Sequence, residues 1–361
     1  MTVKKTFFAF SLVTLAAIMI SGIVLFILLN NLVAVETGHF DQMQHHGAMF
    51  TYNSPVADQQ MAGAAGGDYY VYQKSELIGT FSTYAEALDY AVGFENAAIK
   101  QKGMTNLLWN NYAPYNVFLS ANEYYEFNSF EEARSFAVAK PQAYIYYRPS
   151  NSLIWDNVSD MRQSAFVNNV PLIQQFPELP RGCEVTSLAM LLGYAGIDVD
   201  KLVLAEEIIK NTEPYMVKNG IIYAGNPNDG FVGSMTDYSQ HGLGVYHRPI
   251  YQLMQKYLPD TALDMTGGEF EDLYTLINKG SPVWVIINSK YKALPDSEFV
   301  QWVTPAGEIK VTYREHAVVM TGYDEKYIYF NDPLNNKSSA PKADFIAAWE
   351  QMGRQAISII R

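Results

Sequence analysis

The sequence predicts an α+β protein built from several parts, and three observations support that prediction. A long uncharged apolar segment stands near the N-terminus. A pattern of aromatic strands and capped helices recurs at a spacing of 46 residues, and the C-terminal half alternates an apolar helix with β-rich runs. With 361 residues and 49% hydrophobic content, the chain is long enough for two modest domains or one large one.

The apolar segment, residues 6–35, is long enough to cross a membrane. It has no charged residue and exceeds the roughly 20 residues that a spanning helix needs, whereas a signal-peptide core has about 7–15. Lys4 and Lys5 precede this segment and Glu36 follows it. This charge distribution favours an orientation with the two lysines in the cytoplasm and the residues after the segment outside the cell. We therefore expect residues 1–35 to be a cytoplasmic stub and single-pass anchor in the cell membrane, with extracellular C-terminal domains; a cleaved signal is the alternative.

The charge of the chain limits its partners. Only 17% of residues are charged, and the net charge is −12. Phosphate binding needs clustered lysines and arginines, and the sequence has no such cluster apart from Lys4 and Lys5. We expect no nucleic-acid partner. Residues 36–67 have no apolar period and read as a linker, in which His45 and His46 lack the spaced partners of a metal site.

Residues 68–158 are expected to form a small α+β domain of two similar halves. Three pairs of matching segments lie 46 residues apart: Phe81–Ala87 with Phe127–Ala133, Val71-Tyr72 with Val117-Phe118, and Trp109-Asn110-Asn111 with Trp155-Asp156-Asn157. Each half reads as strand, turn, helix, strand. The strands are expected at 69–72 and 115–119, with returning strands at 107–109 and 144–147. A binding role and a spacer role both remain open.

The helices of the two halves have recognisable starts. Thr83 is followed by Glu86, and Ser129 by Glu132, and each pair has the spacing of a capping box.

Residues 165–361 are expected to form a second, larger α+β domain. Residues 184–195 have a wide apolar helical face that Gly196 closes. Residues 283–287 are a continuous apolar run, typical of a buried strand, and residues 317–322 and 327–331 read as two strands around a turn.

The lone cysteine, Cys183, stands immediately before the apolar helix. It cannot form an intramolecular disulfide, so it is either a small buried apolar residue or a nucleophile. At a helix N-terminus, unpaired amides and the helix dipole favour the thiolate over the thiol. Gly182 beside it would leave room for a substrate backbone to approach.

A thiolate nucleophile needs a base, and the base needs an orienting partner. His316 begins the strand at 317–322. If the turn centres on Asp324, His316 and Asp332 face each other across the hairpin, with Cβ atoms about 4.5–5.5 Å apart. A register slip of one residue would leave Asn331 as the orienting group.

Acyl transfer also needs donors for the developing oxyanion. The Cys183 backbone amide and a side-chain amide upstream of it would serve, and Gln174 and Gln175 are the candidates.

Three stretches of the chain resemble the peptidase C39-like family. They are residues 170–190, VPLIQQFPELPRGCEVTSLAM, with EHAVV at 315–319 and Asn331-Asp332-Pro333. The resemblance covers residues 165–361. It implies a papain-like fold with a Cys-His-Asp triad and an oxyanion-hole glutamine, carried here by Cys183, His316, Asp332 and Gln175.

The resemblance further implies a cysteine peptidase that hydrolyses peptide or isopeptide bonds of a peptide or protein substrate, with no metal or organic cofactor. Relatives fused to ABC transporters usually carry Cys-Gly at the nucleophile. This chain has Cys183-Glu184 and no phosphate-binding loop, so leader processing coupled to export is not expected. Two alternatives stay open: a cell-surface acyltransferase or cross-linking enzyme, and an inactive papain-like surface binding protein.

Overall fold

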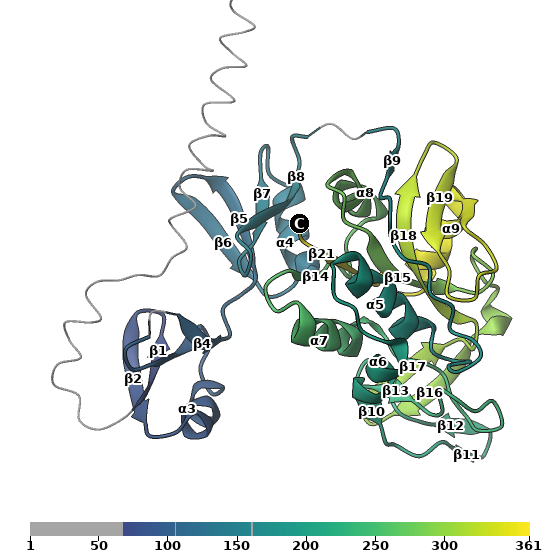
Figure 1. Ribbon diagram of the computed structural model, residues 1–361, viewed down its shortest axis with the longest axis horizontal. Coiled ribbons are helices and arrows are strands. Elements are labelled where there is room, and N and C mark those ends of the chain that lie inside the picture. The colour runs from purple at the N-terminus through teal and green to yellow at the C-terminus, as the bar shows by residue number, and fades with distance from the viewer. Residues whose placement is uncertain (1–67, 105, 160–161) are drawn as a thin grey trace, which may run out of the picture. The chain divides into compact units, whose positions relative to one another are not determined.

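The computed structural model describes residues 68–104, 106–159 and 162–361 (Figure 1). The expected anchor at 1–35 and linker at 36–67 lie outside the described residues. Within the described ranges, every helix is too short or too polar to cross a membrane. Residues 66–361 cluster as one compact unit, and the following description concerns that unit.

Residues 69–156 form two four-stranded sheets, each with one helix. The strands of the first are β1 (Tyr69–Gln73), β2 (Glu76–Phe81), β3 (Ala97–Gln101) and β4 (Leu107–Asn110), in the order β2-β1-β3-β4, with α3 (Tyr84–Ala91). The second has β5 (Tyr115–Ser120), β6 (Glu123–Phe127), β7 (Tyr144–Tyr147) and β8 (Ser152–Asp156), in the order β6-β5-β7-β8, with α4 (Phe130–Val138). The two units therefore have the same strand order.

Each unit has more strands than the sequence pattern suggested. The expected returning strands at 107–109 and 144–147 are not equivalent: they are β4 of the first unit and β7 of the second. The hairpin strands β2 and β6 escaped detection because they carry glutamates and lie mostly exposed or half-buried, which weakens their apolar alternation. Thr83 and Glu86 do form a reciprocal capping box, and Ser129 accepts from the Glu132 amide at 3.2 Å.

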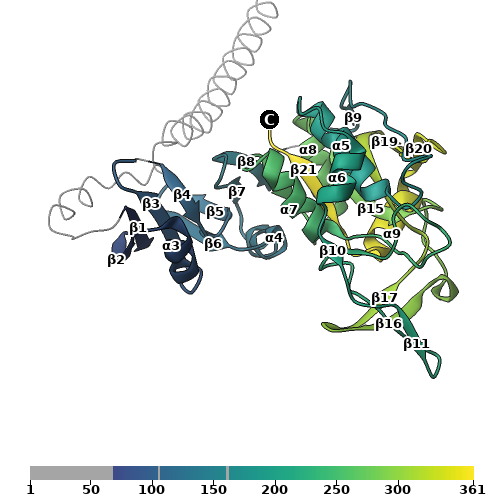
Figure 2. The same ribbon diagram turned by 60° about the horizontal axis from the view of Figure 1, so that its bottom comes forward.

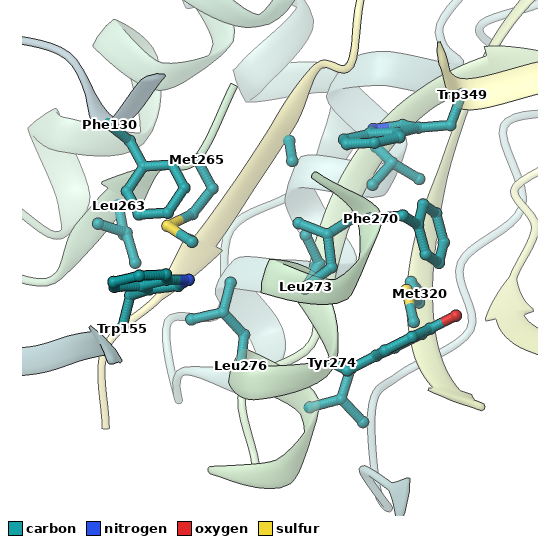
Figure 3. Close-up of a cluster of buried hydrophobic side chains, with 14 of the residues drawn as sticks. Phe130, Trp155, Leu263, Met265, Phe270, Leu273, Tyr274, Leu276, Met320 and Trp349 are labelled. Atoms are coloured by element: carbon teal, nitrogen blue, oxygen red, sulfur yellow. The ribbon is translucent and has the colours of Figure 1, made fainter. Parts of the chain in front are cut away.

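The second unit shares a hydrophobic cluster with the C-terminal part of the chain. Phe130 and Trp155 pack with Leu263 and Met265 (Figure 3). The Tyr115 hydroxyl donates to the Asp264 carbonyl at 2.6 Å. This unit is consequently part of the larger core.

Asp272 lies at the centre of this junction. Its carboxylate accepts from Trp155 Nε1 at 2.8 Å and from Arg134 Nε at 2.6 Å, and it also accepts from the Glu269 amide at 2.7 Å. Burial raises the pKa of Asp272 even though Arg134 and its other hydrogen-bond donors act to lower it. Burial of the Arg134–Asp272 ion pair therefore costs free energy. Removal of Asp272 would cost more, because Arg134 and Trp155 would lose their hydrogen-bond acceptor.

The C-terminal part is organised around a seven-stranded sheet. Its strands run in the order β14 (Ala262–Asp264), β21 (Ala356–Ile359), β15 (Val283–Asn288), β18 (Glu315–Tyr323), β19 (Tyr327–Asn331) and β20 (Ser339–Pro341), and β9 (Ala165–Phe166) pairs with β18. All six residues of β15 are buried, as the continuous apolar run predicts.

Helices cover both faces of this sheet. Trp284 and Ile286 belong to the cluster of α5 (Cys183–Tyr194) and α7 (His247–Tyr257), whereas Val285 and Ile287 belong to the cluster of α8 (Phe270–Asn278) and α9 (Lys342–Gln351). The alternation of β15 side chains between two faces explains why the strand has no polar side.

The C-terminal part also contains smaller elements. They are α6 (Lys201–Glu207), the pair β10 (Lys210–Asn211) and β13 (Phe231–Val232), the short helix η3 (Asp296–Glu298), and a sheet of β11 (Met216–Lys218), β12 (Ile221–Tyr223), β16 (Val300–Thr304) and β17 (Gly307–Val311). Of these, β11, β16 and β17 lie at one end of the C-terminal part (Figures 1 and 2).

We expect Asp272→Ala to lower the free energy of unfolding by about 3 kcal/mol or more, because it leaves Arg134 and the Trp155 indole without their buried acceptor. Urea denaturation of the full chain, followed by tryptophan fluorescence, measures this loss. Glu271→Ala, an exposed position on the same helix, is the control and should change stability by less than about 0.5 kcal/mol. Equal effects of the two substitutions would show that the junction contributes nothing.

Candidate active site

Cys183 is the first residue of α5, so the helix begins one residue earlier than the sequence predicts, and the thiol lies at the helix N-terminus as expected. Gly182 is the N-cap and has no side chain to occupy the helix start. A Cβ atom at Gly182 would lie 2.6 Å from the Leu179 Cβ, so the turn entering the helix requires glycine here. This close approach within the chain, rather than room for a substrate, accounts for Gly182.

His316 and Asp332 form a buried pair. His316 Nε2 and Asp332 Oδ1 are 2.7 Å apart, with side chains 2% and 1% exposed. The contact does not arise from the expected hairpin register. Val319 pairs with Asn331 across the hairpin, and the strand partner of His316 is Ile287 on β15. Asp332 instead lies just beyond the end of β19.

Asp332 is held by several donors. The Tyr291 hydroxyl donates to Oδ2 at 2.6 Å, and the Leu334 amide donates to Oδ1 at 2.9 Å. Burial acts to raise the pKa of Asp332, but the hydrogen bond and charge of His316, with Tyr291, outweigh it and hold the pKa below the usual value. Asp332 is thus a carboxylate at neutral pH. Tyr291 was not found from the sequence, where nothing near it signals a role.

Asn331, the alternative orienting residue, serves elsewhere. Its Nδ2 donates to the carbonyls of Val170 and Pro171, both at 3.0 Å. Asn331 thereby holds the segment before Gln175 against the end of β19, and the hydrogen-bond partner of His316 is Asp332 instead.

One cleft brings three of the predicted site residues together. Gln175, Cys183 and His316 all line a hollow of about 480 Å³, which Arg181 and Tyr238 also border. Cys183 is only 6% exposed, yet it faces this hollow and is not sealed in the core. Because Nε2 of His316 is taken by Asp332, Nδ1 is the ring nitrogen available to the thiol.

The family model of the Peptidase_C39 like family matches residues 167–357, which is more than half of the chain. This chain belongs to the C39-like peptidase family. The match spans every residue of the cleft named above, including Cys183 and His316, and it also spans Asp332.

Two relatives bear on the comparison. The uncharacterized protein YvpB of Bacillus subtilis is 46% identical over 203 residues, which cover 55% of this chain and 78% of YvpB. A crystal structure from Bacillus anthracis, provisionally described as a C39-like peptidase, is 48% identical with a TM-score of 0.52. It covers 55% of this chain and 98% of that one. These findings establish the family and the fold.

Gln175 lines the same cleft as Cys183 in this C39-like domain, but its side-chain amide is engaged. Nε2 donates to the Leu179 carbonyl at 3.2 Å and to the Pro180 carbonyl at 2.8 Å, while Oε1 is buried without a partner. In this arrangement Gln175 holds the turn that precedes Cys183. Gln174 is exposed and contributes its carbonyl oxygen to Lys201.

The surroundings of the Cys183 thiol differ from the sequence expectation. Its sulfur lies 3.3 Å from Glu184 Oε2, and Glu315 is close by. Burial, followed by the charges of Glu184 and Glu315, raises the pKa of the Cys183 thiol well above its usual value, although the Ala317 amide acts to lower it. The helix N-terminus alone would have lowered it.

Both glutamates were missed from the sequence. Glu184 is the one charged residue among the apolar positions of α5, and Glu315 directly precedes His316. Within the described ranges, Cys183, Glu184 and Glu315 are the grouping compact enough to surround a cation. Burial raises the pKa of Glu184 to about 7 and that of Glu315 further, so a carboxyl here is protonated near neutral pH and is a poor cation ligand.

Glu184 should make the stability of the protein depend on pH. Its pKa rises from 4.5 in the unfolded chain to about 7 on folding, so the folded state binds the proton more tightly. The stabilisation is complete below pH 4.5 and is lost as the pH rises through about 7.

We expect the free energy of unfolding of the wild type to fall across this window by on the order of 3 kcal/mol more than that of Glu184→Gln, which keeps the contribution of Glu315. Urea denaturation of the full chain between these pH values measures it. Glu308→Gln, which removes an exposed carboxylate, should retain the wild-type slope. An unchanged slope in Glu184→Gln would contradict the assignment.

Proposed function

We propose that this protein is a membrane-anchored, extracytoplasmic cysteine peptidase that hydrolyses peptide or isopeptide bonds by a Cys-His-Asp mechanism. The buried His316–Asp332 pair, 2.7 Å apart, is the observation that carries the proposal, because His316 lines the same cleft as Cys183. Membership of the C39-like family supports the peptidase class. The uncharged run at 6–35, with Lys4 and Lys5 before it, supports the anchor and its orientation.

The first half-reaction forms a thioester. His316 Nδ1 takes the thiol proton as Cys183 Sγ attacks the scissile carbonyl carbon. The Asp332 carboxylate stabilises the resulting imidazolium. The imidazolium then gives that proton to the leaving amine, the C–N bond breaks, and the acyl group stays on the sulfur.

The second half-reaction restores the enzyme. His316 takes a proton from water, the hydroxide oxygen attacks the thioester carbon, and the C–S bond breaks. The proton returns to the sulfur as the carboxylic acid product leaves. The Cys183 amide, at the start of α5, is the main oxyanion donor in this proposal. The Gln175 amide is the second donor, once one of its two bonds to backbone carbonyls is released.

A larger hollow next to the cleft supports a preference for bulky apolar side chains. It measures about 890 Å³ and shares Gln240, His241, Gly242 and Tyr313 with the cleft. Its apolar lining includes Leu179, Phe231, Met235 and Trp302. A substrate extended through the cleft would place one side chain there, within a few residues of the scissile bond.

The mechanism is tested by incubating the full-length protein with a mixture of peptides and identifying new amino termini by mass spectrometry. Cys183→Ala should abolish cleavage. Asp332→Ala should lower kcat/KM by about 10²-fold or more, because the imidazolium loses its carboxylate. The exposed Asp296→Asn is the matched control. Cleavage that persists in Cys183→Ala would refute the proposal, and attachment of added amines without hydrolysis would indicate an acyltransferase.

The subsite is tested by filling it. Ala205 on α6 lines the larger hollow, so Ala205→Trp should lower kcat/KM about tenfold or more for substrates with a bulky apolar side chain at the preferred position. Substrates with alanine there should change little. Ala306→Trp, on the exposed turn between β16 and β17, is the control. A uniform loss across all substrates would argue against a specificity pocket.

A further inference from the structure

Two dipeptides that each join a reactive residue to a glutamate lie side by side. Cys183-Glu184 begins α5 and Glu315-His316 begins β18. The Cys183 sulfur and one oxygen from each carboxyl lie within 4.8 Å of one another. Three groups that can each carry a negative charge therefore meet beside the nucleophile.

The two carboxyls are held differently. Glu184 is fully buried, its Oε1 accepts from the Val245 amide at 2.7 Å, and its Oε2 faces the Cys183 sulfur. Glu315 Oε1 is buried and has no hydrogen-bond partner. Glu184 thus has a donor for a negative charge, whereas Glu315 Oε1 has none, and Glu315 as a whole is half-buried at the edge of the cleft.

Gly244 keeps the two carboxyls together. A Cβ atom there would lie 2.3 Å from Glu184 Oε1 and 2.7 Å from Glu315 Oε2, so any side chain would displace one of them. The fold therefore preserves the space in which these like-charged groups meet.

The groups around Glu184 and Glu315 do little to stabilise a negative charge on either carboxyl. Lys210, which follows α6, is the cation whose charge reaches Glu184 among the described residues, and its Nζ bonds to the Ala205 carbonyl instead. Tyr246 faces Glu315 from the segment before α7, and His316 is engaged with Asp332. Burial raises the pKa of both carboxyls. The pKa of Glu315 is raised further by the nearby negative charge of Glu184. Two buried carboxylates this close do not both ionise readily.

We propose that Glu184 and Glu315 hold one proton and one negative charge between them, and that this pair restrains the ionisation of Cys183 in the resting enzyme. Glu184 carries the charge and Glu315 the proton. The carboxylate next to the sulfur keeps the thiol protonated until His316 removes the proton during attack on substrate. The pair keeps its own proton throughout that step. This inference rests on the proposed function, since it assigns a control on its nucleophile.

The experiment measures the rate at which iodoacetamide alkylates the full-length protein as a function of pH. Cys183 is the single cysteine, so alkylation reports one sulfur and needs no peptide substrate. In Glu184→Gln the midpoint of the thiol titration should fall by about one unit or more, which makes labelling at pH 7 about tenfold faster. The glutamine retains an acceptor for the Val245 amide.

Glu315→Gln tests the location of the proton. A glutamine imitates a neutral carboxylic acid, so labelling at pH 7 should stay within about twofold of wild type. At higher pH, where Glu315 of the wild type ionises, the variant should react faster. The infrared carbonyl band of a protonated carboxylic acid, present in wild type at neutral pH, should be lost in this variant. Glu308→Gln should match wild type in every measurement.

The outcomes separate the two proposals. An unchanged thiol titration in Glu184→Gln, with melting temperature retained, overturns the inference. A tenfold slower labelling of folded Glu315→Gln at pH 7 also overturns it, because Glu315 would then act as a carboxylate. Failure of every variant to label at any pH would instead contradict the proposed function.

Discussion

Two hydrogen bonds hold the start of α5 against the central sheet. Trp284 Nε1 donates to the Glu184 carbonyl at 3.0 Å, and Ser187 Oγ donates to the Ala317 carbonyl at 3.1 Å. Each bond ends on a residue adjacent in the chain to Cys183 or His316. Because both are buried and the surrounding side chains are closely packed, this junction sets the separation between thiol and imidazole. The rest of the site is arranged around it.

The site distributes its charges unevenly. Asp332 receives donors from His316, Tyr291 and backbone amides, so its negative charge is well stabilised. Glu184 and Glu315 lie nearby with far fewer donors, which makes their charges expensive. A carboxylate bonded to His316 and a carboxyl pair beside the Cys183 thiol thus occur in one small region. Such local instability is characteristic of functional sites and is offset by packing elsewhere.

The two four-stranded units have diverged in what they contact. The second contributes Phe130 and Trp155 to the core of the C-terminal part, and Arg134 pairs with Asp272. The first has its own small core around Val71 and Ile99. At the position equivalent to Arg134 it carries Leu88, which cannot pair with a carboxylate. The second unit is accordingly a structural part of the larger domain.

Local patterns in the sequence were sufficient to predict, to within one residue of its start, the helix at Cys183, and also the buried strand β15 and the hairpin of β18 and β19. Helix starts and strand alternation depend on residues close together in the chain, and the motifs around Cys183 and His316 identified the family. The sequence placed Asp332 beside His316 through the wrong register, since the turn lies beyond Asp324, with Tyr323 paired to Ile328, and Asp332 reaches His316 from beyond its strand. Only the tertiary structure located Tyr291, Glu184 and Glu315 around the reactive groups. Their effect depends on burial and on contacts between segments far apart in the chain, and local sequence patterns predict neither of these.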